Sequence, residues 1–88
     1  MDGNRKPIEK KPLRLREDIV SKVLRVFYRR GSVVLRIVKW NDRPPVLEKR
    51  RMLRLPTGQD FPGRVMGLNA LDLSIIEVNH TEIQELLQ

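Results

Sequence analysis

Residues 33–54, VVLRIVKWNDRPPVLEKRRMLR, hold two runs of alternating aliphatic and basic residues around a break, NDRPP, at positions 41–45. Alternation with a period of two and many β-branched side chains is typical of strands. Asparagine, aspartate and two prolines in succession favour a turn, because proline cannot donate to a strand ladder. We therefore expect a β-hairpin that carries basic side chains on a sheet, with the only tryptophan, Trp40, at its rim.

The segment before this hairpin predicts another strand. Residues 19–30 are rich in Val, Ile, Phe and Tyr, which favours a strand over the competing helix, and Gly31-Ser32 supplies a tight turn. Within the strand over residues 33–40, one parity would form the core face: Val33, Leu35, Ile37 and Lys39. The other parity would form a half-exposed face: Val34, Arg36, Val38 and Trp40.

The segment after the hairpin completes the sheet. Residues 46–55 predict a third strand, although their mixed pattern does not assign its two faces. Residues 56–63, PTGQDFPG, have the composition of a loop, and residues 64–68 would form a short fourth strand. Asp42, Glu48 and Asp60 are expected to be turn residues and ion-pair partners.

The C-terminal part predicts an interrupted helix. Asn69 is a candidate N-cap of a helix over residues 70–78, and Asp72 would support its exposed amides. Asn79-His80 interrupts the apolar pattern, and the spacing of Thr81 and Gln84 predicts a capping box for a second segment over residues 81–87. The expected fold class is α+β, with a four-stranded antiparallel sheet followed by a C-terminal kinked helix.

The 88 residues predict one small domain over residues 18–88 behind a flexible basic tail at residues 1–17. A domain this small has a thin core, which oligomerisation can extend. The helix also has apolar residues on more than one side, so we expect a homodimer. The residues expected at its interface are Leu73, Ile76, Ile83 and Leu87.

The chain contains no cysteine, no secretory signal and no apolar run of membrane-spanning length, so we expect a cytoplasmic protein, nucleoid-associated if bacterial. His80 has no partner ligands, and neither a nucleophile motif nor a phosphate-binding loop is present. We therefore expect no enzyme activity, no metal site, no cofactor, no small-molecule substrate and no membrane partner.

Charge is distributed unevenly along the chain. The formal net charge is +7, and all 18 Lys and Arg residues lie within residues 1–64. Residues 65–88 contain four acidic residues and no Lys or Arg. A basic sheet followed by an acidic helix predicts a polyanionic partner for the sheet. Either a single-stranded nucleic acid or an acidic protein would fit, and the second possibility would make the chain a protein-interaction domain.

Three segments resemble the positive cofactor four family of transcriptional coactivators, and above all its small bacterial single-stranded DNA-binding members. They are VKWND with a proline at position 45, the strand PVLEKR over residues 45–50, and PGR at residues 62–64 followed by Leu68-Asn69 and the amphipathic helix. Two positions depart from the family pattern. Met52 stands where an aromatic residue is usual, and Val65 stands where glycine is usual.

This resemblance implies a homodimer whose sheets bind single-stranded DNA through basic and aromatic residues, in transcription, replication or repair. It matches Trp40, Arg50 and Arg64 to family positions. Basic side chains neutralise phosphates and aromatic rings stack on unpaired bases, and the aromatic residues expected near the sheet are Phe27, Tyr28 and Trp40. The predicted nucleic-acid-binding residues, for DNA or RNA, are Arg25, Tyr28, Arg36, Lys39, Trp40, Lys49, Arg50, Arg54 and Arg64.

Overall fold

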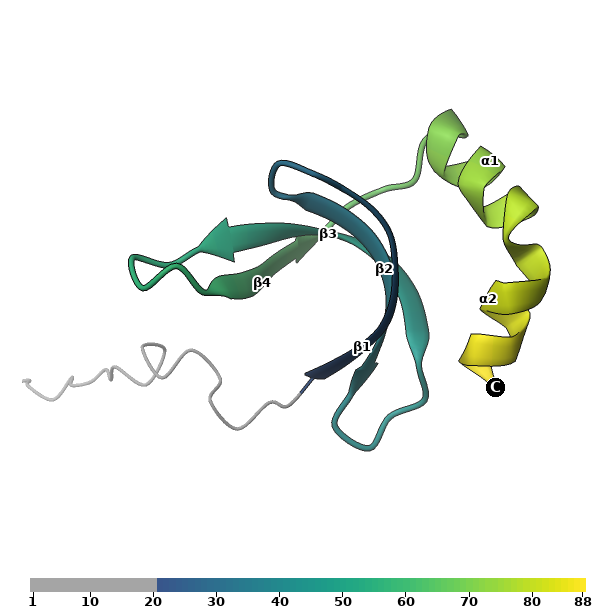
Figure 1. Cartoon of the computed structure of the whole chain (residues 1–88), viewed down its shortest axis with the longest axis horizontal. Coiled ribbons are helices and arrows are strands. Elements are labelled where there is room, and N and C mark those ends of the chain that lie inside the picture. The colour runs from purple at the N-terminus through teal and green to yellow at the C-terminus, as the bar shows by residue number, and fades with distance from the viewer. Residues whose placement is uncertain (1–20) are drawn as a thin grey trace, which may run out of the picture.

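The computed structural model describes residues 21–88, so the predicted tail, the domain start at residue 18 and positions 19–20 of the first strand lie outside the described residues. The fold class is α+β, as the sequence predicts: a four-stranded antiparallel sheet precedes two C-terminal helices (Figure 1). The elements are β1 (Ser21–Arg30), β2 (Val33–Trp40), β3 (Val46–Arg54), β4 (Asp60–Val65), α1 (Ala70–Val78) and α2 (His80–Leu87).

The sheet is a meander in which each strand pairs with its neighbour in the chain, in the order β1-β2-β3-β4. The predicted hairpin is its centre, because β2 and β3 pair from Val33 opposite Arg51 to Val38 opposite Val46. Asn41 adopts a positive φ of 49° in the turn between them. Asparagine tolerates this left-handed conformation better than most residues, which explains its position directly after Trp40.

The fourth strand lies earlier in the sequence than predicted. β4 spans Asp60–Val65, so half of the expected loop over residues 56–63 is strand and the expected strand over residues 64–68 is largely wrong. Pro62 and Gly63 suggested a loop, but both stand in a strand that, among the described strands, pairs with β3 alone. An edge strand tolerates proline because one of its sides needs no donor.

Two irregularities in β1 explain why its sequence shows no clean apolar face. Register shifts occur between Val23 and Arg25 and between Val26 and Tyr28. A β-bulge of this kind inserts an extra residue and changes which face the following side chains occupy. As a result Arg25 and Tyr28, three positions apart, pair with Ile37 and Leu35, which lie on one face of β2.

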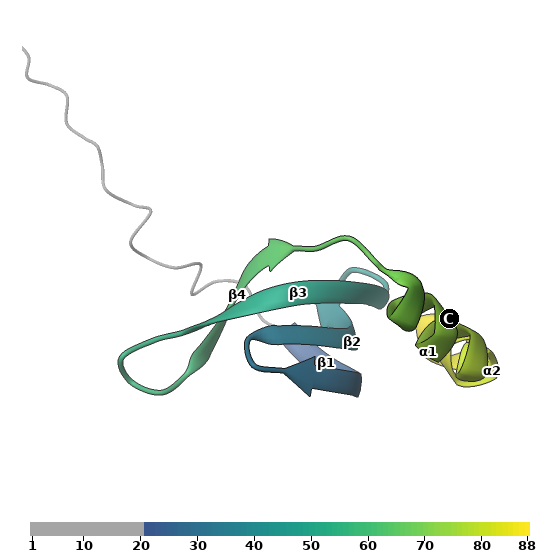
Figure 2. The same cartoon turned by 90° about the horizontal axis from the view of Figure 1, so that it is seen from above.

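The two helices cover one side of the sheet (Figures 1 and 2). We call this side the helix face, and the other side the open face. Leu35 and Ile37 are completely buried on the helix face, where Ile83 of α2 is also buried. The open face of β2 was expected to be half-exposed, and this is wrong for Val34, Arg36 and Val38, which are buried. The sheet is bent, with the helices against its outer side and the β3–β4 hairpin projecting away from them (Figure 1).

The start of α1 matches the prediction. The Asn69 side chain accepts a hydrogen bond from the amide of Asp72 at 3.0 Å, and the Asp72 carboxylate accepts one from the amide of Asn69 at 2.8 Å. The predicted interruption is also present, because α1 ends at Val78 and α2 begins at His80. The expected Thr81 cap is wrong: α2 begins one residue earlier, after Asn79, and no side chain of the described residues caps it.

Candidate nucleic-acid interface

Cross-strand pairing assigns the two faces of the central hairpin. Arg36 pairs with Glu48 and Val34 pairs with Arg50, so these four side chains share a face. Lys49 points the opposite way, since neighbouring residues of a strand alternate, and it reaches Asp72 of α1. The arginines at positions 36 and 50 therefore lie on the open face.

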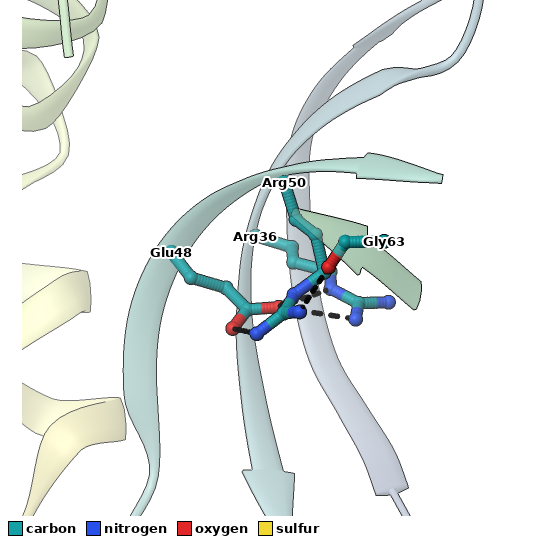
Figure 3. Close-up of polar contacts among 4 residues, drawn as sticks. All are labelled: Arg36, Glu48, Arg50 and Gly63. Carbon is teal, nitrogen blue, oxygen red and sulfur yellow. Dashed lines mark hydrogen bonds and ion pairs between the residues drawn. The ribbon is translucent and has the colours of Figure 1, made fainter. Parts of the chain in front are cut away.

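An arginine–glutamate cluster occupies the centre of this face, formed by Arg36, Glu48 and Arg50 (Figure 3). The Glu48 carboxylate accepts hydrogen bonds from Arg36 Nε at 3.1 Å and from Arg50 Nε and Nη2 at 2.9 and 3.0 Å. Arg50 Nη1 donates to the carbonyl of Gly63 at 2.6 Å. The cluster thus joins β2, β3 and β4.

Glu48 remains ionised although it is only 7% exposed. Burial is the largest influence on its pKa and raises it, but the hydrogen bonds and charges of Arg50 and Arg36 together outweigh burial, and the pKa is lowered. Two guanidinium groups and one carboxylate leave the cluster with one net positive charge. The expected role of Glu48 as an ion-pair partner is confirmed.

Trp40 lies against this cluster. The guanidinium carbons of Arg36 and Arg50 lie over its ring at 5.7 and 5.2 Å from the centroid. Both distances are within the range of a cation–π interaction, which holds the indole in place from its own strand and from β3. Trp40 is only partly buried, so part of this residue is accessible to a ligand.

Trp40 and Arg50 line an open groove with a volume of about 710 Å³. This volume is within the range of small-molecule sites and is sufficient for a nucleotide unit. Phe61 of β4 lines the same groove, although it was missed among the aromatic residues because its segment was expected to be a loop. The remaining lining residues are Ser21, Asn41, Arg43, Leu55, Gln59, Asp60, Pro62 and Gly63.

Asp60 connects both edges of the sheet beside this groove. Its carboxylate accepts hydrogen bonds from Arg29 Nη1 of β1 at 2.6 Å and from Arg54 Nε of β3 at 3.0 Å. Hydrogen bonds from Arg29 and then Arg54 are the main reasons why the pKa of Asp60 is lowered. Arg54 keeps 66% of its side chain exposed, so this predicted binding residue remains accessible while paired.

Two predicted binding residues, Tyr28 and Lys49, instead belong to the helix face. Tyr28 Oη and Lys49 Nζ both donate to the carboxylate of Asp72, at 2.5 and 2.9 Å. Asp72 is completely buried. Burial, the largest influence, raises its pKa, but donors from Tyr28, Lys49 and Asn69 outweigh this and lower it. These contacts fasten the start of α1 to the sheet, and the side chains are not on the open face.

Other predicted nucleic-acid-binding residues lie apart from the arginine–glutamate cluster. Arg25 pairs with Glu82 of α2 at 2.7 Å, and its guanidinium lies 4.6 Å from the ring centroid of Phe27. Lys39 donates to the carbonyl of Asn41 at 3.0 Å. Arg64 is exposed in β4. Of the nine predicted binding residues, the structure brings three into direct contact on the open face: Arg36, Trp40 and Arg50.

The predicted dimer residues divide in a similar way. Leu73 is 58% exposed on α1, and Ile76 and Leu87 are partly exposed. Ile83 is only 5% exposed because it packs in the core of its own chain, so it does not belong to an exposed interface. Val78, which was not in the predicted set, is 83% exposed.

Comparison with family models, curated proteins and solved structures finds no match to this chain. Within residues 21–88, no cluster of three or more metal-ligating side chains occurs. Neither helix of this described part is long and apolar enough to cross a membrane. The function of the open face therefore has to be inferred from its own chemistry.

Proposed function

We propose that the chain binds single-stranded nucleic acid, DNA or RNA, on the open face of its sheet. The observation that carries the proposal is the position of Trp40, flanked by two guanidinium groups at a groove of nucleotide size. Aromatic rings and guanidinium planes stack on unpaired bases of any sequence. A duplex hides those base faces within its own stack, so this surface favours single strands.

The charge distribution supports the same proposal. Exposed Arg43 lines the groove, exposed Arg54 pairs with the groove residue Asp60, and exposed Arg64 follows on β4. Both helices lie in the segment that contains acidic residues and no Lys or Arg. A polyanion is thus attracted to the sheet and repelled by the helix side, which orients its approach.

We further propose that the protein acts as a homodimer joined through α1. Leu73 is 58% exposed, and Ile76, three residues further on and on the same side of the helix, is partly exposed. A second copy of the chain would bury such apolar side chains together, as isologous dimers do. Sedimentation equilibrium should show a dimer at micromolar concentration, and Leu73→Asp should shift it toward monomer. A wild-type protein that sediments as a monomer contradicts this part of the proposal.

The binding proposal is tested by fluorescence anisotropy with matched single- and double-stranded oligonucleotides over a salt series. Single strands should bind more tightly at moderate salt. Trp40→Ala should weaken single-strand binding by about fivefold or more, because one stacked base contributes about 1–3 kcal/mol. It should leave duplex binding nearly unchanged.

Two exposed arginines provide a matched pair of variants for the same assay. Arg43→Ala removes a charge that lines the groove, so it should weaken binding and flatten the salt dependence. Arg51→Ala removes the same charge from the opposite parity of β3, so it should have little effect. Equal or tighter binding of duplex at every salt concentration would contradict the proposal. Equal losses in both arginine variants, with no effect of Trp40→Ala, would leave a generic basic surface such as one that docks an acidic protein.

A further inference from the structure

All three side-chain nitrogens of Arg50 are already engaged inside the protein. Arg50 uses Nε and Nη2 for Glu48 and Nη1 for the carbonyl of Gly63. Arg36 donates from Nε to Glu48, while its Nη2 lies 3.1 Å from the same carboxylate and is buried without a hydrogen-bond partner among the described residues. A phosphate is bound through the N–H edge of a guanidinium, whereas a base stacks on its plane. In this arrangement the N–H edge of Arg50 is occupied, and Arg36 is only 6% exposed, so neither side chain presents a free edge to a phosphate.

Glu48 also places a negative charge on the floor of the open face. Its carboxylate lies about 3 Å from both guanidinium groups. Any phosphate that approached either arginine closely would also approach this like charge, and about half of the attraction would be cancelled. A nucleobase carries no net charge and meets no such repulsion. The groove rim differs, because Arg43 lines it and no carboxylate among residues 21–88 forms an ion pair with Arg43.

We infer that Glu48 is a positioning residue that directs the bases of a bound strand toward Trp40 and keeps its phosphates at the rim. This inference rests on the proposed function and specifies the orientation of the strand. Glu48 acts mainly through Arg50: by occupying its Nε and Nη2 and offsetting the charge of the cluster, it turns a phosphate-binding side chain into a stacking surface beside the indole.

The test compares a fluorescein-labelled oligothymidine with a strand of the same length that contains only abasic deoxyribose phosphates. Both probes carry the same backbone charge, and only the first has bases. Wild-type protein should bind the abasic strand about tenfold more weakly or worse, because base stacking is lost. This ratio reports the orientation of the strand, and a purely structural role of Glu48 would not move it.

Glu48→Gln should narrow the ratio to about threefold or less, because the released Arg50 can then hold a phosphate. The slope of log affinity against log salt should steepen by about 0.7, as expected for one released arginine. Glu82→Gln is the matched control, since Glu82 is also paired with an arginine but on the helix face. It makes the same change in net charge and should leave both the ratio and the slope as in the wild type.

A second variant keeps the inference testable if Glu48→Gln does not fold. Arg50→Met should lower affinity for oligothymidine without changing the salt slope, whereas Arg43→Ala should reduce the slope. Absence of any single-strand binding by the wild type would defeat the proposed function itself. Binding with equal affinity for both probes would remove the base stacking on which both proposals rest, whereas a Glu48→Gln protein with unchanged ratio and slope would overturn this inference alone.

Discussion

Gly63 of β4 lies close to the backbone of β3, and Gly63→Ala should disturb both the fold and the open face. A Cβ atom built on Gly63 would lie 2.7 Å from the carbonyl oxygen of Arg51 and 3.3 Å from Cγ of Leu53. The first contact is with backbone, which cannot rotate away. To reach an ordinary separation, β4 must move by roughly 0.7 Å relative to β3.

That movement has a cost in stability and a consequence for the site. Inserting a methyl group into a packed position typically destabilises a protein by about 1–3 kcal/mol. The alanine also reduces the conformational entropy of the unfolded chain, which stabilises the folded state by about 0.4–1 kcal/mol. We therefore expect a net loss of about 1–2 kcal/mol. The hydrogen bond from Arg50 Nη1 to the Gly63 carbonyl is 2.6 Å long, and this movement of β4 should lengthen it.

Urea unfolding followed by the fluorescence of Trp40 measures this change, at a fixed protein concentration in case assembly contributes. Gly67→Ala is the matched control. It lies four residues further on, its φ is not in the left-handed region, and no atom of the described residues beyond its chain neighbours stands within 4 Å of the Cβ it would gain. It should change stability by less than about 0.5 kcal/mol. A Gly63→Ala protein as stable as the Gly67→Ala protein would refute the reasoning.

Asp72→Asn should destabilise the chain by about 3–5 kcal/mol in the same unfolding assay, because Lys49 would keep a buried charge without its partner. A double variant that combines Asp72→Leu with Lys49→Met should recover much of that loss, and a mild effect of Asp72→Asn alone would contradict the role assigned to it. The folded-state pKa values of Glu48 and Asp72 are lowered, so the unfolded chain binds protons more readily in acid. The stability that these two carboxylates contribute is fully present above the ordinary carboxyl pKa of about 4 and is lost as the pH falls below it. The urea midpoint should therefore fall with the pH in this range, and a midpoint that rises would be inconsistent with both pKa shifts. Asn69→Ala should cost about 1 kcal/mol by thermal unfolding, whereas Thr81→Ala should cost little, and equal effects would mean that Asn69 is not the dominant cap.

Local chemistry made much of the fold predictable. Asn69 and Asp72 satisfy the exposed amides of the same helix turn, so their spacing in the sequence was sufficient to locate the start of α1. Alternation in residues 33–40 likewise located β2. Pro62 and Gly63 led to a wrong loop prediction in β4. The cost of proline or glycine in a strand depends on whether that strand lies at an edge, and this is known only once the sheet is assembled.

The site was harder to predict because its contacts cross long stretches of chain. Lys49 and Arg50 are adjacent basic residues of one strand, and composition cannot distinguish them. Lys49 is directed to Asp72, 23 residues away, and Arg50 to the carbonyl of Gly63, 13 residues away. Glu48 could be expected to pair with arginine, but which arginines it meets depends on the cross-strand register. Bulges in β1 similarly moved Tyr28 to the helix face, away from its predicted role.

The meander order of the sheet has a consequence for how the protein folds. Every strand pairs with its neighbour in sequence, so the sheet can close through short loops at low entropic cost. Docking of α1 must instead bring Asp72 to Tyr28 across 44 residues. We expect the sheet to form first and the helices to dock afterwards. In native-state hydrogen exchange, amides of α1 should then open at lower free energy than those of β2, and helix release would leave the surface that carries Trp40 assembled.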